Sequence, residues 1–121
     1  MLGWHGLPAD DMILNVTINE HAYPIRIPDG MPEEAADMFA RMDADMNQGW
    51  QMSRVWVDHP DTLQRCQIVA DRLLTAMENQ NQELATMMAA YIVARTPDVR
   101  EVVIDTDGDM TQTRIERGAQ P

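Results

Sequence analysis

The amino-acid sequence predicts an α+β domain of order ββ-α-α-ββ, in which two hairpins form one antiparallel sheet against two or three helices. Three patterns in the 121 residues support this. Apolar and polar residues alternate between positions 12 and 28, and again between 101 and 115, as in half-buried strands. Between these stretches apolar residues recur at helical spacing. We expect a flexible segment at 1–10, a single domain at 11–117 and a tail at 118–121.

The first hairpin is expected over residues 12–28, with its turn at NEHA. Alternate positions of its first strand point to one side: Met12, Leu14, Val16 and Ile18. In the second strand, Pro24 has no amide hydrogen to donate to a neighbouring strand. We therefore expect the second strand to lie at the edge of the sheet, or to turn Pro24 outward.

A helix is expected to follow the first hairpin, from Pro32 to about Asn47. Pro32 suits the first helical position, and Glu33 and Glu34 suit the first turn, where the helix dipole favours negative charge. An apolar stripe at three-to-four spacing should face the core: Ala35, Met38, Phe39, Met42 and Met46.

The longest helical pattern runs from Pro60 to Arg95 and ends before Pro97. Its heptad positions are Leu63, Ala70, Met77, Leu84 and Tyr91, with Cys66, Leu73, Gln80, Met87 and Ala94 three residues behind them. An unbroken helix would be about 54 Å long at about 1.5 Å per residue. That length exceeds the size of a compact domain of this mass. The helix therefore either breaks near 79–82 or projects and pairs with a second copy.

This wide apolar stripe predicts self-association, most simply as a homodimer, because so small a domain can hardly cover it alone. The predicted oligomer interface consists of Leu63, Ala70, Met77, Leu84, Met87 and Tyr91.

The closing segment contains DTDGDMTQTRIE, which matches the carboxylate spacing of a calcium loop. An EF-hand needs glycine at the sixth position, where this chain has Met110, and helices on both sides, where it has β-type residues. Asp107–Gly108 between alternating stretches instead indicates a two-residue hairpin turn. We expect no calcium site here.

Charge and composition exclude several classes of function. The net charge of −11 repels phosphate backbones and anionic lipids, so neither a nucleic acid nor a membrane is expected as a partner. The nine basic residues are all arginine, which excludes lysine-based covalent catalysis and a P-loop. One cysteine fits a reducing compartment, and the expected location is the cytoplasm. The lack of lysine, with many Ala and Asp residues, is typical of GC-rich bacterial genomes.

No arrangement of residues favours catalysis or a metal. The three histidines are scattered, and no C-x-x-C, H-x-x-x-H or E-x-x-H pattern occurs. His59 lies seven residues before Cys66, about 10 Å away along a helix and beyond hydrogen-bonding reach. Cys66 is therefore expected to be a buried structural thiol. We expect no metal and no cofactor, and the sequence leans against an enzyme.

The segment WQMSRVW holds the strongest sign of a partner contact. Trp50, Met52, Arg54 and Trp56 combine residue types that are enriched at protein interfaces. The same tryptophans could equally cover the core between helices. We name these four residues as the expected partner-binding site, with a second protein as its target.

Residues 15–48, from NVTINEHAYPIRIP to DADMNQ, resemble the small bacterial ZapA-type cell-division proteins. The resemblance implies a hairpin followed by helices that dimerise through a long coil, and it covers about a quarter of the chain. The closing hairpin departs from that family. From these features we expect a small, non-catalytic bacterial accessory or interaction protein that acts as a homo-oligomer. The alternative is a ligand-binding or effector module with a pocket between sheet and helices.

Overall fold

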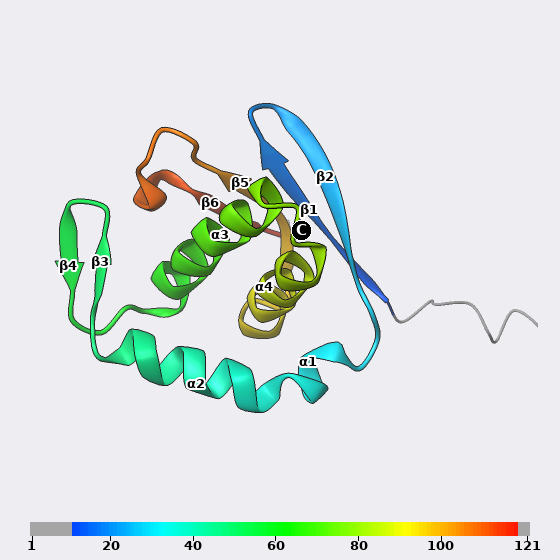
Figure 1. Ribbon diagram of the computed structural model, residues 1–121, viewed down its shortest axis with the longest axis horizontal. Coiled ribbons are helices and arrows are strands. Elements are labelled where there is room, and N and C mark those ends of the chain that lie inside the picture. Colours follow the sequence, from blue (N-terminus) through cyan, green and yellow to red (C-terminus); the bar gives the residue numbers. More distant parts are fainter. Residues whose placement is uncertain (1–10, 119–121) are drawn as a thin grey trace, which may run out of the picture.

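The computed structural model describes residues 11–118 as an α+β fold with two sheets and a layer of helices (Figure 1). The α+β class is as predicted. The segment expected to be flexible, residues 1–10, lies outside the described residues, as do residues 119–121 of the tail. The elements are β1 Met12–Ile18, β2 His21–Ile27, α1 Met31–Glu34, α2 Ala36–Asn47, β3 Trp50–Met52, β4 Val55–Val57, α3 Thr62–Glu78, α4 Gln82–Arg95, β5 Val99–Ile104 and β6 Arg114–Arg117.

The main sheet has four strands in the order β2-β1-β5-β6. The two terminal strand pairs join into one sheet, as predicted, but the sheet is mixed rather than antiparallel. Strands β1 and β5 run parallel, with Val16 opposite Val102. Two parallel strands need a long crossover, and here β2 and all the helices lie between them. The predicted order was also incomplete, because β3 and β4 form a separate two-stranded hairpin.

Strand β2 lies at the edge of the sheet, as Pro24 predicted. Its turn consists of Asn19 and Glu20, both with positive φ angles of 52° and 70°. Positive φ at both residues of a two-residue loop matches the right-handed twist of the flanking strands. The other edge strand, β6, is four residues long and largely charged. Short, charged or proline-bearing edges resist pairing with another sheet, so neither edge favours edge-to-edge association.

Helix α2 buries most of the apolar stripe that the sequence predicts for it. Pro32 lies in the first turn of the short helix α1, and the chain bends at Ala35 before α2 begins. Helix α2 buries Phe39, Met42 and Met46. These side chains join the core together with Leu14 and Val16 of β1, Ile27 of β2, and Val102 and Ile104 of β5.

The long helical pattern breaks, which decides between the two alternatives left open by the sequence. Helix α3 ends at Glu78, and Gln80 takes a positive φ of 58°. The side chain of Asn81 then caps α4 by accepting a hydrogen bond from the backbone N–H of Leu84 at 3.1 Å. Helix α4 folds back and packs against α3, so one half of the apolar stripe covers the other (Figure 1).

The predicted two-residue turn at Asp107–Gly108 is wrong. Residues 105–113 form a longer loop with a short 3-10 helix at Met110–Gln112. Asp105 Oδ2 accepts hydrogen bonds from the backbone N–H groups of Asp107 and Asp109, both at 3.0 Å. The buried side chain of Gln67 donates to the carbonyls of Thr111 and Thr113. The aspartate side chains thus hydrogen-bond to the backbone of their own loop and compete with strand pairing for its N–H groups. Neither the alternating pattern nor the Asp-Gly pair reveals this competition.

Candidate functional site

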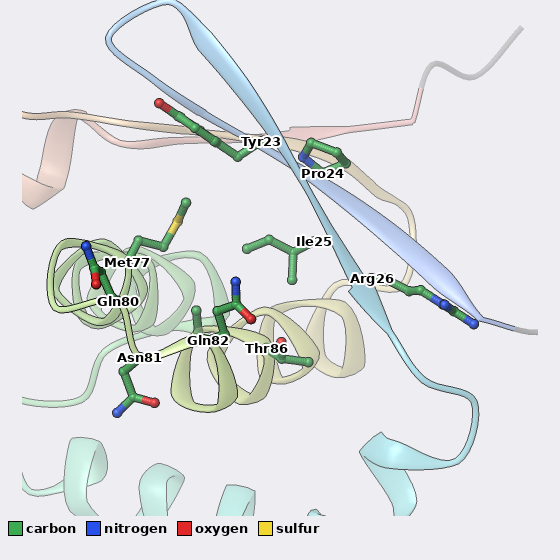
Figure 2. Close-up of a pocket in the computed structure, with 10 residues that line it drawn as sticks. Tyr23, Pro24, Ile25, Arg26, Met77, Gln80, Asn81, Gln82 and Thr86 are labelled. Atoms are coloured by element: carbon green, nitrogen blue, oxygen red, sulfur yellow. The ribbon is translucent and has the colours of Figure 1, made fainter.

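A cavity lies between edge strand β2 and the turn that joins α3 to α4 (Figure 2). We call it the β2 groove. It has a volume of about 650 Å³, which is within the range of small-molecule sites. Its lining residues are Tyr23, Pro24, Ile25, Arg26, Met77, Gln80, Asn81, Gln82, Ala85 and Thr86.

None of the described residues that line the β2 groove has a carboxylate, although the chain has 20 acidic residues. Its one charged residue, Arg26, is held by Asp11 through a hydrogen bond of 2.6 Å. Within residues 11–118, the side chains of Tyr23, Gln82 and Thr86 make no hydrogen bond to the protein. Figure 2 shows Met77 pointing toward Tyr23. The groove therefore offers uncharged polar groups beside an apolar surface.

The β3–β4 hairpin holds the four residues expected to bind a partner, and it separates them by exposure. Met52 is buried and Trp50 is half-buried against the core. Arg54 and Trp56 are exposed, and 56% of the Trp56 surface is accessible. The segment WQMSRVW is therefore partly core and partly surface. Strand β3 packs against the core through Trp50 and Met52, and strand β4 exposes Trp56.

Trp56 is held in place despite its exposure. Its indole N–H donates a hydrogen bond of 2.8 Å to Asp58 Oδ1. The indole ring lies over Gly49, which has a φ of +109°, and a Cβ atom there would come within 2.2 Å of the ring. Glycine at position 49 therefore allows both the backbone conformation and the close packing of the ring. An exposed aromatic side chain that is already ordered loses little entropy on binding.

A second cavity lies beside the tip of this hairpin, with a volume of about 430 Å³. We call it the hairpin depression. The hairpin contributes Met52, Ser53, Arg54 and Val55 to it, and the loop contributes Asp107, Gly108, Asp109 and Thr111. Val55 is 58% exposed, and the backbone N–H of Met110 donates to Ser53 Oγ at 3.0 Å. The hairpin tip is therefore fixed against the 105–113 loop.

A polar cluster joins the three longer helices at a place where no sequence pattern indicates a site. Asp43 of α2 accepts hydrogen bonds from the hydroxyl of Tyr91 and from Arg95 Nη2 at 2.6 Å. Arg65 Nη1 of α3 lies 3.3 Å from Asp43 Oδ1. These side chains border a depression of about 370 Å³. The sequence spacing within α2 does not distinguish Asp43 from Asp37 and Asp45. Only the packing of the three helices reveals that Asp43 belongs to a polar cluster.

The titration behaviour of this cluster follows from its geometry. Burial alone would raise the pKa of Asp43, but the hydrogen bonds from Tyr91 and Arg95 outweigh it and hold that pKa below its ordinary value. Burial and the adjacent carboxylate raise the pKa of Tyr91. Tyr91 therefore stays neutral and donates, Asp43 stays charged, and the cluster acts as a structural connection between helices.

The six residues expected at an oligomer interface differ in exposure. Ala70 and Tyr91 are fully buried within the chain. Met77, Leu84 and Met87 are half-buried against the core, and Leu63 is 52% exposed. The helix break thus places part of the predicted interface inside the monomer. Self-association itself stays a prediction.

The residues considered for chemistry lie apart. Cys66 is buried, and burial raises the pKa of its thiol, as expected for a structural cysteine. His59 and His21 each lie within hydrogen-bonding distance of a backbone carbonyl, of Asn47 and Asn19. Residues 11–118 contain no group of three or more His, Cys, Asp or Glu side chains placed to hold a metal ion. Nor does this part of the chain contain a helix long and apolar enough to cross a bilayer.

Comparison with known proteins finds no match to this chain among family models, curated proteins or solved structures.

Proposed function

We propose that this chain is a non-catalytic interaction protein that acts as a homo-oligomer, and that the β3–β4 hairpin forms its contact surface. The observation that carries the proposal is Trp56, an indole that is 56% exposed yet fixed by Asp58 and Gly49. Tryptophan is the residue type most enriched among interface hot spots. Exposing an ordered indole to water gives up hydrophobic stabilisation that a contact would recover.

The Trp56→Ala variant is expected to stay folded and to lose self-association. The side chain is largely outside the core, so its removal should cost about 1 kcal/mol or less, well below the 3–5 kcal/mol of a buried aromatic. Sedimentation velocity from one to tens of micromolar would measure the mass, and urea unfolding followed by circular dichroism would measure the stability.

Two further variants sharpen this test. Gly49→Ala keeps the indole but forces it to move, because the added Cβ would occupy the ring's position. It should therefore weaken self-association as Trp56→Ala does. Tyr23→Ala removes another exposed aromatic, on β2, and should leave the mass unchanged. A wild-type protein that is strictly monomeric at tens of micromolar, or an unfolded Trp56→Ala variant, would contradict the proposal.

A second candidate function is the binding of an uncharged small ligand in the β2 groove. Among residues 11–118, the lining has no carboxylate, and the polar groups of Tyr23, Gln82 and Thr86 make no hydrogen bond, which favours this function. An aromatic ring beside amide side chains suits a neutral sugar, which has an apolar face and several hydroxyl groups.

If the β2 groove takes such a ligand, glucose should shift the backbone amide resonances of residues 23–26 and 80–86 in a two-dimensional NMR titration. Glucose 6-phosphate should shift them less, because the net charge of −11 repels anions. The shifts should disappear in Gln82→Ala and persist in Gln112→Ala, which alters a residue of the 105–113 loop. Unchanged spectra at millimolar glucose would exclude this candidate.

A further inference from the structure

The tip of the β3–β4 hairpin brings to the same depression one cation and one carboxylate that have no partner among residues 11–118. Within residues 11–118, the guanidinium of Arg54 makes no ion pair or hydrogen bond. The carboxylate of Asp107 likewise accepts no hydrogen bond from the described residues. The backbone N–H of Asp107 donates a hydrogen bond to the side chain of Asp105. Both side chains are exposed. They line the depression together, yet no ion pair joins them within the chain.

The remaining carboxylate of this depression has a different role. Asp109 Oδ1 accepts hydrogen bonds from the backbone N–H and the hydroxyl of Thr111, at 3.0 and 2.5 Å. The hydrogen bonds from Thr111 hold the pKa of Asp109 below its ordinary value. Asp109 thus stays charged and caps its own loop, which leaves Asp107 as the carboxylate available to an outside group.

A patch with one free positive and one free negative group is complementary to itself. In a two-fold dimer the same surface meets its own copy, so each residue of a contacting pair occurs twice. Two chains of net charge −11 repel one another on average. Contact is therefore favoured where opposite charges can face each other, and Val55, 58% exposed at the same site, supplies apolar area to the centre of such a contact.

We propose that two copies of this chain dock hairpin tip to hairpin tip about a two-fold axis, with Arg54 of each protomer against Asp107 of its partner. This arrangement deepens the proposed self-association and rests on it. It identifies the occupant of the hairpin depression as a second copy of the chain, and it identifies Arg54 and Asp107 as the residues that set the orientation.

Charge reversal tests the arrangement. Arg54→Glu places two carboxylates opposite each other, and Asp107→Arg places two guanidinium groups opposite each other. Each single variant should weaken the dimer about tenfold or more, since like charges that face across an interface cost several kcal/mol. The double variant Arg54→Glu/Asp107→Arg should restore the dissociation constant to within about threefold of the wild-type value, because it recreates the pair with its signs exchanged.

Arg72→Glu provides the matched control. This variant changes the net charge by the same amount as Arg54→Glu. Arg72 itself lies exposed on α3 and has no ion pair within the described residues. Dissociation constants would be measured by sedimentation at low and at high salt. Salt screens the exposed pairs and the repulsion between the two chains alike, so the difference in dissociation constant between each single reversal and the wild type should shrink at high salt. Urea unfolding would verify that each variant folds.

The outcomes separate the two proposals. A wild-type protein without self-association would overturn the proposed homo-oligomer and this arrangement with it. A wild-type dimer that both single reversals leave intact would overturn only the Arg54–Asp107 pairing. Weakening by the single variants without restoration in the double variant would also overturn the pairing, as would an equal effect of Arg72→Glu.

Discussion

The Tyr91→Ala variant is expected to lose about 3–5 kcal/mol of unfolding free energy, the range for removal of a buried aromatic side chain. Tyr91 is fully buried, and its ring meets that of Phe39 edge to face at 5.5 Å between centroids. The guanidinium carbon of Arg95 lies 5.1 Å from the Tyr91 ring centre. Alanine would leave a cavity at the junction of α2 and α4. Because small domains have only about 5–15 kcal/mol of stability, the loss should be plain in urea unfolding.

Tyr91→Phe separates the contribution of the ring from that of the hydroxyl. Phenylalanine fills the same space but cannot donate to Asp43. We expect this variant to lose about 1.5–3 kcal/mol, the usual contribution of a hydrogen bond to a charged group. If Tyr91→Ala instead keeps the wild-type stability and loses self-association, Tyr91 belongs to an oligomer interface, as the heptad pattern predicts.

The second large effect is expected from Asp43→Ala, with a loss of about 2–3 kcal/mol at neutral pH. This carboxylate is the common acceptor for Tyr91 and Arg95, and Arg65 lies beside it. Its removal leaves the hydroxyl of Tyr91 and the guanidinium of Arg95 without their acceptor, whereas Arg65 keeps its hydrogen bonds to Pro60 and Asn47. The Asp43 side chain is 23% exposed, so water recovers part of the loss. Asp37→Ala, an exposed aspartate of the same helix, is the matched control.

The pH dependence of this cluster has a definite sign. The pKa of Asp43 is lower in the folded chain than its ordinary value of 3.8. The stabilisation is therefore fully present above that ordinary value, and it is lost as the pH falls through the lower pKa of the folded state. The stability difference between wild type and Asp43→Asn should shrink on acidification below about pH 4. A difference that stays constant down to pH 2 would show that the charge of Asp43 does not stabilise the fold.

Local patterns in the sequence were sufficient to predict the strands β1, β2 and β5 and the buried face of α2. Alternation placed β1, β2 and β5, and Pro24 placed β2 at the sheet edge, because a residue without an amide hydrogen cannot serve two neighbouring strands. The apolar stripe of Phe39, Met42 and Met46 identified the buried face of α2. These features depend on residues close together in the chain, which is the range over which periodicity carries information.

The hairpin β3–β4 and the long loop after β5 were beyond such patterns. Three-residue strands contain too few positions for alternation to distinguish them from a connecting segment. The loop at 105–113 depends on hydrogen bonds that Gln67 donates to it and that Ser53 accepts from it, and both residues lie 44 or more positions away in the sequence. Asp-Gly signals a tight turn only when no such distant partner competes for the backbone.

The sequence by itself determined the fold class, the edge position of β2, the buried face of α2 and the burial of Cys66, since each depends on local spacing or residue chemistry. Only the tertiary structure decided that β1 and β5 run parallel, that Ala70 and Tyr91 are covered by their own chain, and that Trp56 remains exposed. Heptad spacing is the same for a helix that folds back on itself and for one that pairs with a second copy. The break at Gln80 and the cap at Asn81 bring α4 back against α3, and that contact between distant residues settles which surfaces remain free.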